Sequence, residues 1–142
     1  MKLTRASDYA IRGIVYMSMQ SQGSIVVIPE VAREMDVPVG FLARIFQSLS
    51  RAGIVISHRG KKGGYSMARK PEEVTLRDVV EAVEGDIKLN ICLDGYNVCN
   101  RMEFCSVRKE LDKVQNDFIT SLDKTNFAYF AAQEKAHRDS LK

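Results

Sequence analysis

The sequence has no run of about 18 apolar residues, only two histidines and only three cysteines. A helix that spans a bilayer needs about 20 mostly apolar residues, so we expect no membrane-spanning segment and no membrane partner. The N-terminal residues lack the apolar core of a secretory signal, which favours a cytoplasmic protein. With so few histidines, no Ser-His-Asp spacing and no Gly-Lys-Ser/Thr phosphate loop, the sequence argues against an enzyme.

The three cysteines lie together, as Cys92, Cys99 and Cys105 in the pattern Cys-x6-Cys-x5-Cys. Thiols stay reduced in the cytoplasm, and an odd number leaves one cysteine outside any internal disulfide, so the pattern favours metal binding. Thiolates are the soft ligands that select zinc and iron–sulfur clusters. Three thiolates leave one position for a further ligand, and a weak oxygen ligand there would make the site reactive enough for a sensor.

Charge is divided unevenly along the chain. Residues 1–70 carry eleven Lys or Arg against four Asp or Glu, a net charge of +7, whereas residues 71–142 carry ten against fourteen, a net charge of −4. Ordinary surface scatter is the simple alternative, but a basic half joined to an acidic half suits a protein that contacts a polyanion with one end.

Apolar periodicity predicts a first helix over residues 3–19, capped by Thr4 or Ser7, and two more from Pro29 and from residue 39 to Ala52. In the third helix, Leu42, Ile45, Phe46 and Leu49 follow the spacing of a buried face. The second and third helices form a helix-turn-helix candidate. Its predicted DNA-binding residues are Val39, Gly40, Phe41, Ala43, Arg44, Gln47 and Arg51.

Residues 54–68 predict a β-hairpin whose glycine-rich tip carries Arg59, Lys61 and Lys62. A hairpin directly after a helix-turn-helix indicates a winged helix. The glycines allow close approach of the backbone to another group, and the cations favour phosphate or a narrow minor groove. The alternatives are a nucleotide-binding loop, which lacks its required motif, and a charged hairpin tip with no role.

Thr75 begins a short helix, and Ser106 begins a long one with an apolar stripe of Val107, Leu111, Val114, Phe118, Ile119 and Leu122. The stripe could pack on its own domain, but little chain remains to cover it, which favours a homodimer and a palindromic double-stranded DNA site. The polar tail from Gln133 is expected to fray. The fold class is mainly α with a small β-hairpin: a winged helix-turn-helix domain (1–85), a cysteine loop (86–105), and a dimerisation helix and tail (106–142).

The chain resembles the IscR/NsrR-type winged-helix regulators. The residues that carry the resemblance are Met1-Lys2-Leu3-Thr4 with Tyr9-Ala10, Phe41-Leu42, Arg51-Ala52-Gly53-Ile54-Val55, Arg59-Gly60 with Gly63-Gly64-Tyr65, Val79-Val80-Glu81-Ala82-Val83-Glu84-Gly85, and the three cysteines. The resemblance implies a transcription regulator whose DNA affinity depends on an iron–sulfur cluster that senses nitric oxide, redox state or cluster supply. The alternative is a zinc- or thiol-based winged-helix regulator without a cluster.

The resemblance also bears on the fourth ligand. Some relatives use a histidine shortly after the third cysteine, but here Val107 and Arg108 follow Ser106. Others use an aspartate in the first helix of the partner subunit, and Asp8 matches that position. Asp8 near a helix start is also explained by the helix dipole alone. A 4Fe–4S cluster held by Cys92, Cys99, Cys105 and the other subunit's Asp8 is expected over a 2Fe–2S cluster, and the rival fourth ligands are Asp94, Glu103 and His58.

Overall fold

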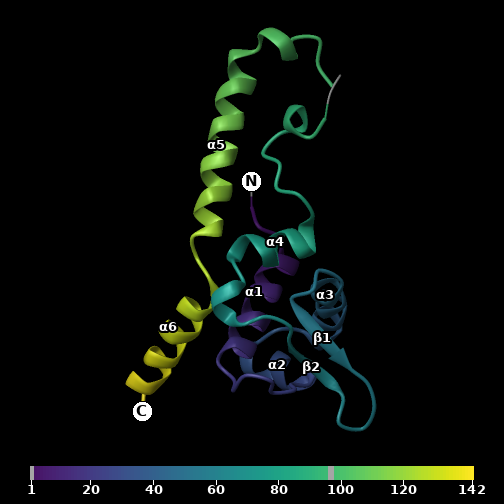
Figure 1. Cartoon of the computed structure of the whole chain (residues 1–142), viewed down its shortest axis with the longest axis vertical. Helices are drawn as coiled ribbons and strands as arrows, with labels where there is room; N and C mark the ends of the chain where they lie inside the picture. Colours follow the sequence, from purple (N-terminus) through teal and green to yellow (C-terminus); the bar gives the residue numbers. More distant parts are fainter. Residues whose placement is uncertain (1, 96–97) are drawn as a thin grey trace.

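The structure, a computed structural model, describes residues 2–95 and 98–142. Within these residues the helices are α1 (Arg5–Ser18), α2 (Ile28–Met35), α3 (Val39–Arg51), α4 (Leu76–Glu84), α5 (Ser106–Asp123) and α6 (Phe127–Ser140), the strands are β1 (Val55–His58) and β2 (Gly64–Met67), and the single 3-10 turns are η1 (Pro71–Glu73), η2 (Ile91–Leu93) and η3 (Met102–Phe104). This arrangement confirms the mainly α fold with a small hairpin (Figure 1).

The helix-turn-helix forms because the apolar faces of α1, α2 and α3 meet in one core. Leu42, Ile45, Phe46 and Leu49 are all buried, as the periodicity predicts. Gly13 of α1 allows the closest approach, because a Cβ there would lie 2.8 Å from a ring carbon of Phe46. Helix α3, the second helix of the helix-turn-helix, therefore packs closely against α1, and its opposite face is exposed.

The hairpin is fastened to the helices by a third extended segment. Val26 exchanges two backbone hydrogen bonds with Tyr65 of β2, each 2.8 Å long. A Cβ at Gly64 would lie 2.2 Å from the Val26 carbonyl oxygen, and one at Gly63 would lie 2.4 Å from the His58 carbonyl oxygen. These two glycines are thus required by contacts within the chain. The sequence suggested close approach to an outside group, and the structure adds close approach within the chain at both glycines.

Helix α4 starts with a capping box between Thr75 and Asp78 and leads into the cysteine segment. From there residues 86–95 and 98–105 lie away from the body of the winged helix, and α5 runs back toward that body beside them (Figure 1). At its lower end, Leu122 is buried against Val80 and Ile87 of its own chain. Leu122 was expected in the dimer seam, so that part of the prediction is corrected: the packing of α5 onto α4 covers it.

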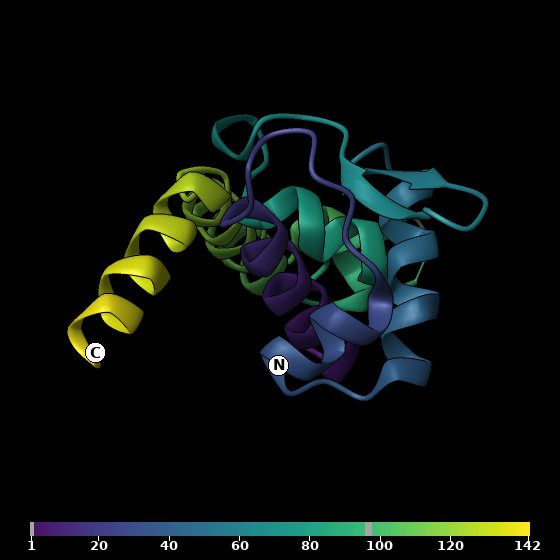
Figure 2. The same ribbon diagram turned by 90° about the horizontal axis from the view of Figure 1, so that it is seen from below.

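The C-terminal segment is a regular helix, so the prediction of a frayed tail from Gln133 is wrong. Phe127 at its start is fully buried in the main core, and its N–H donates to the Val74 carbonyl at 3.0 Å. Helix α6 packs on α1 at this end and then extends to one side of the molecule (Figure 2). Tertiary anchoring at Phe127 keeps a polar helix folded. Across the described residues, no helix has both the length and the apolar character needed to cross a membrane.

Candidate nucleic-acid interface and cysteine cavity

The outer face of α3 is open along its whole length. All seven predicted DNA-binding residues of the helix, Val39, Gly40, Phe41, Ala43, Arg44, Gln47 and Arg51, are exposed. Residues 37–71, which contain α3 and the hairpin, include seven Lys or Arg and no Asp or Glu. The helix therefore presents an acid-free, basic surface, which is the requirement for contact with a polyanion.

The hairpin tip extends this basic surface. Arg59, Lys61 and Lys62 are exposed, and none of them forms an ion pair with the residues that the structure describes. His58 at the end of β1 lies 2.7 Å from the Ser66 hydroxyl, measured from its Nε2 atom. His58 is thus bonded within the hairpin, which lies at the opposite end of the molecule from the cysteine segment in Figure 1.

The three cysteines line one cavity of about 220 Å³ beside the start of α5. Its walls are mainly apolar, and its lining residues are Asn90, Ile91, Cys92, Val98, Cys99, Met102, Cys105, Val107, Arg108 and Leu111. All three thiols are free; Cys92 and Cys105 are half-buried and Cys99 is exposed. Side chains separated by up to 13 positions in the sequence therefore face a common space.

Backbone donors are already directed at two of the sulfurs. The Arg101 N–H donates to Cys99 Sγ at 3.4 Å, and the Arg108 N–H donates to Cys105 Sγ at 3.4 Å. Cys105 is the N-cap of α5, where the positive end of the helix dipole stabilises negative charge. The Arg108 side chain also holds the loop, because its Nε donates to the Cys92 carbonyl at 3.1 Å. These contacts hold two of the sulfurs and the Cys92 backbone in place around the cavity.

A zinc ion and an iron–sulfur cluster need different arrangements of the thiolates. In the part of the chain that the structure describes, no three His, Cys, Asp or Glu side chains converge closely enough to hold one metal ion. A tetrahedral zinc ion needs every thiolate about 2.3 Å from one point. In an iron–sulfur cluster, each thiolate binds a different iron atom, so the sulfurs are spread more widely. The three cysteines share one cavity, and among the described residues they do not form a site for a single metal ion.

None of the four predicted fourth ligands lines this cavity. Asp8 lies on α1, where its side chain is 50% exposed and pairs with Arg12 at 2.9 Å. The other terminal guanidinium nitrogen of Arg12, Nη1, donates to the Met35 and Asp36 carbonyls at the end of α2, at 3.4 Å each. Asp94 and Glu103 are exposed residues of the loop, and Glu103 lines a separate hollow with Cys105. Within one chain, Asp8 is therefore not among the residues that surround the cysteine cavity.

Sequence reasoning missed the contacts that position these parts. The Glu84 carboxylate at the end of α4 accepts hydrogen bonds from the Thr4 N–H at 2.9 Å, the Thr4 hydroxyl at 2.8 Å and the buried Ser7 hydroxyl. The Ser7 bond in particular lowers the Glu84 pKa. Gln115 of α5 is buried and accepts from the Leu89 N–H at 2.8 Å, which fastens the loop to α5. The sequence signal that could have suggested this role for Gln115 is its position, as a polar residue, on the apolar face of the long helix.

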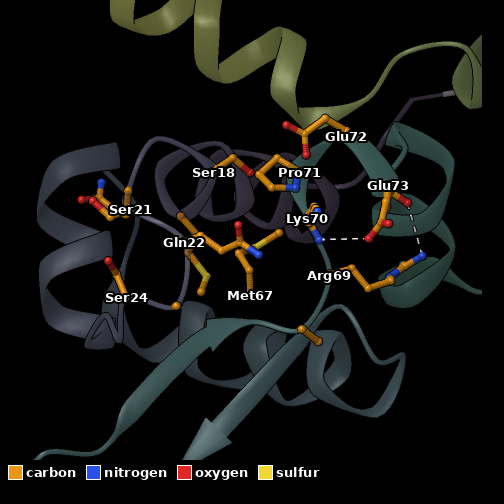
Figure 3. Close-up of a pocket in the computed structure, with 14 residues that line it drawn as sticks. Ser18, Ser21, Gln22, Ser24, Met67, Arg69, Lys70, Pro71, Glu72 and Glu73 are labelled. Atoms are coloured by element: carbon orange, nitrogen blue, oxygen red, sulfur yellow. Dashed lines mark hydrogen bonds between the residues drawn. The ribbon is translucent and has the colours of Figure 1, made fainter.

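A separate polar groove of about 780 Å³ lies between the turn after α1 and the segment from Met67 to Glu73 (Figure 3). Its lining contains hydroxyl, amide and charged side chains but neither cysteine nor histidine. Along one side of the groove the Lys70 N–H donates to Glu73 Oε2 at 3.2 Å, a hydrogen bond within the same segment. The groove includes none of the residues predicted for DNA or metal binding.

A helix-turn-helix, a hairpin wing and an acid-free basic face together define a winged-helix protein. The family described as iron-dependent transcriptional regulator, Rrf2, matches residues 3–133, and the chain belongs to this family. Members of the family are DNA-binding transcription regulators and not enzymes. The resemblance stated from the sequence is thereby confirmed.

Individual relatives agree with this assignment. The chain is 34% identical over 123 residues to Protein aau3 of Rhizobium meliloti (strain 1021), covering 86% of this chain and 79% of that protein. The fold is similar to that of CymR, the global cysteine regulator of B. subtilis, with a TM-score of 0.76, 20% identity, and coverage of 94% and 98% of the two chains. It is also similar to T. potens IscR, with a TM-score of 0.73, 21% identity, and coverage of 96% and 88%.

Proposed function

We propose that this protein is a homodimeric, cytoplasmic transcription regulator whose affinity for a palindromic operator is controlled by a 4Fe–4S cluster. The observation that carries the proposal is the shared cavity of Cys92, Cys99 and Cys105, in which two sulfurs already accept backbone hydrogen bonds. A bound cluster would supply an iron centre that reacts with nitric oxide or oxidants, or that is lost when cluster supply falls. The proposal includes the division of the chain into a DNA-binding domain (1–85), a cluster-binding loop (86–105) and a dimerisation segment (106–142).

The dimer is proposed to form along the upper part of α5. Val107 and Val114 are 63% and 53% exposed, and they are separated by two helical turns on one face. Leu111 between them and Phe118 below are half-buried. A second copy of the same helix would cover this face, and the resulting two-fold symmetry would pair two α3 helices on DNA.

Asp8 is the proposed fourth ligand from the partner subunit. To bind iron, its carboxylate must leave Arg12, and Arg12 also holds the end of α2 through two carbonyls. Ligation in one subunit would therefore change contacts beside the helix-turn-helix of the other. A signal acts on DNA binding only when the two states differ in such contacts, and this exchange of partners supplies a difference.

Anaerobic purification with visible spectroscopy and iron and sulfide analysis tests the proposal directly. We expect a brown protein with about four iron and four sulfide per chain, and loss of both on Cys92→Ser, Cys99→Ser or Cys105→Ser. A matched Ser106→Ala variant, adjacent to the loop but without a thiol, should keep the cluster. A colourless protein with one zinc per chain would contradict the cluster.

The alternative is a zinc- or thiol-based winged-helix regulator without a cluster. It is favoured by the exposed Cys99 thiol, and by the fold that this chain shares with a protein named a global cysteine regulator. In that case, oxidation of the thiols would change DNA affinity in protein that contains no iron.

A further inference from the structure

The first turns of α3 expose large apolar side chains. Phe41 is 64% exposed and Val39 is 49% exposed, whereas the apolar residues on the inner face of the helix are almost fully buried. Single exposed apolar residues are common, but two large ones in the first turn of one helix make this end of α3 a candidate contact surface.

The Phe41 ring is held in place and directed beyond the helix. Side chains on a helix tilt toward its N-terminus, so Phe41, at the third helical position, covers the N-terminal end of α3. The ring packs against Tyr9 of α1, with 6.3 Å between ring centroids and an angle of 55°. Tyr9 thus supports one side of the ring and leaves the remainder at the tip of the helix.

Charge indicates which partner this tip accepts. Arg44 follows Phe41 by about one turn on α3, and residues 37–71, which include the hairpin, contain seven Lys or Arg and no acidic residue. Figure 2 places α3 and the hairpin along the same side of the molecule, with α6 on the opposite side. A protein partner would need an apolar centre surrounded by acidic residues. The major groove of DNA has this arrangement in every sequence, because phosphates lie on both sides of the base edges.

We infer that Phe41 reads thymine, by apolar contact with its 5-methyl group in the major groove of each half-site. The residues at the start of a recognition helix are those that reach base edges. The thymine methyl is the one apolar group displayed there, and phenylalanine can pack on it. Arg44 and Gln47, one to two turns further on, provide hydrogen-bonding groups for neighbouring bases. This inference rests on the proposed DNA-binding function and adds the base that the helix recognises.

The test begins with an operator selected from a pool of random double-stranded DNA by the purified full-length protein. Each thymine of the selected duplex is then replaced singly by deoxyuridine, which removes only the methyl group. For the wild-type protein we expect affinity to fall about fourfold at one thymine position per half-site, the value of about 0.8 kcal/mol per buried methyl-sized group. Phe41→Ala should bind the unmodified duplex more weakly and lose sensitivity at that same position.

Tyr129→Ala is the matched control, because Tyr129 is an aromatic residue 56% exposed on α6, away from α3. It should keep the wild-type response to every deoxyuridine. Equal sensitivity of Phe41→Ala and wild type at every position would overturn the inference while leaving DNA binding intact. So would dissociation of the Phe41→Ala dimer in sedimentation, since Phe41 would then contact a second copy. Failure to select any preferred duplex would overturn the DNA-binding proposal itself.

Discussion

Glu84 is a single side chain that joins the start of α1 to the end of α4. Its carboxylate accepts three hydrogen bonds from Thr4 and Ser7, and its pKa is lowered, first by the Ser7 hydroxyl. A carboxylate with a lowered folded-state pKa stabilises the fold above its unfolded pKa of about 4.3. That contribution is lost as the pH falls through the lower, folded-state value.

We expect Glu84→Gln to lower the free energy of unfolding at pH 7 by about 1 kcal/mol, at the low end for a charged hydrogen bond because the residue is exposed. The difference from wild type should shrink as the pH falls from 5 to about 3, as followed by urea denaturation. Glu72→Gln, at an exposed glutamate of η1, is the control and should leave the curve unchanged. An unchanged gap between Glu84→Gln and wild type at pH 3 would contradict this role.

The hairpin was predicted correctly from the sequence, but the internal contacts of its glycines were not. Pattern alone showed a tight, basic hairpin tip between Ile54 and Ala68. It could not show that Val26, nearly forty residues away, packs its carbonyl oxygen against Gly64. Contacts between distant segments decide such close approaches, and a local pattern contains no information on them.

At the scale of elements, the hairpin is predicted to contact the DNA backbone. Changing Lys61 and Lys62 together to Ala should weaken binding to all sequences and lower the slope of log affinity against log salt by about two, since each phosphate contact contributes about one. Titrations at several salt concentrations measure this slope. The control pair, Lys124→Ala with Lys135→Ala, removes the same charge from exposed positions outside the wing. Equal slopes for wild type and the wing variant would show that the tip stays free of DNA.

Helix α5 divides into a lower part covered by its own chain and an upper part whose stripe stays open. Val114 belongs to the open part, so Val114→Asp should leave the fold intact and place a charge in the proposed seam. Burying it unpaired costs several kcal/mol, and sedimentation should show monomers at micromolar concentration. Asn116→Asp adds the same charge to the opposite face of α5 and should remain dimeric. A Val114→Asp protein that still dimerises would place the seam elsewhere.

The sequence did not predict which part of the apolar stripe on α5 is covered by its own chain. The spacing from Val107 to Leu122 was correctly read as one apolar stripe on a long helix. Its division between Leu122, which packs on Val80, and Val114, which does not, depends on where α4 crosses α5. The crossing is set by tertiary contacts such as Arg77 with Asp123, 3.1 Å apart and 46 residues apart in sequence.

At the scale of the whole molecule, the Asp8 proposal joins two subunits in one site. Asp8→Ala should fold normally, because an exposed ion pair with Arg12 contributes only about 0.3–0.5 kcal/mol. It should change the visible spectrum of the cluster and its rate of reaction with nitric oxide. Arg12→Ala is the matched control, since it breaks the same ion pair and keeps the carboxylate, so its spectrum should match wild type.

A mixed dimer separates ligation within a subunit from ligation between subunits. When an Asp8→Ala chain is paired with a chain whose three cysteines are changed to serine, the intact cysteines lie on one chain and the intact Asp8 lies on the other. The single remaining cysteine site then faces the intact Asp8 of its partner and should give the wild-type spectrum. A spectrum like that of the Asp8→Ala homodimer would place the aspartate in the same subunit as the cysteines.

Cys105 is the N-cap of α5 and also lines the cavity, so its sulfur both caps a helix and is available to a ligand. The Arg108 amide that donates to it is one of the first N–H groups of the helix, which have no partner within the helix itself. Any group that engages the sulfur, by alkylation, oxidation or coordination, alters the acceptor of that amide. Hydrogen–deuterium exchange at Arg108 therefore reports the chemical state of the cysteine from the backbone, without a chromophore and before any DNA is added.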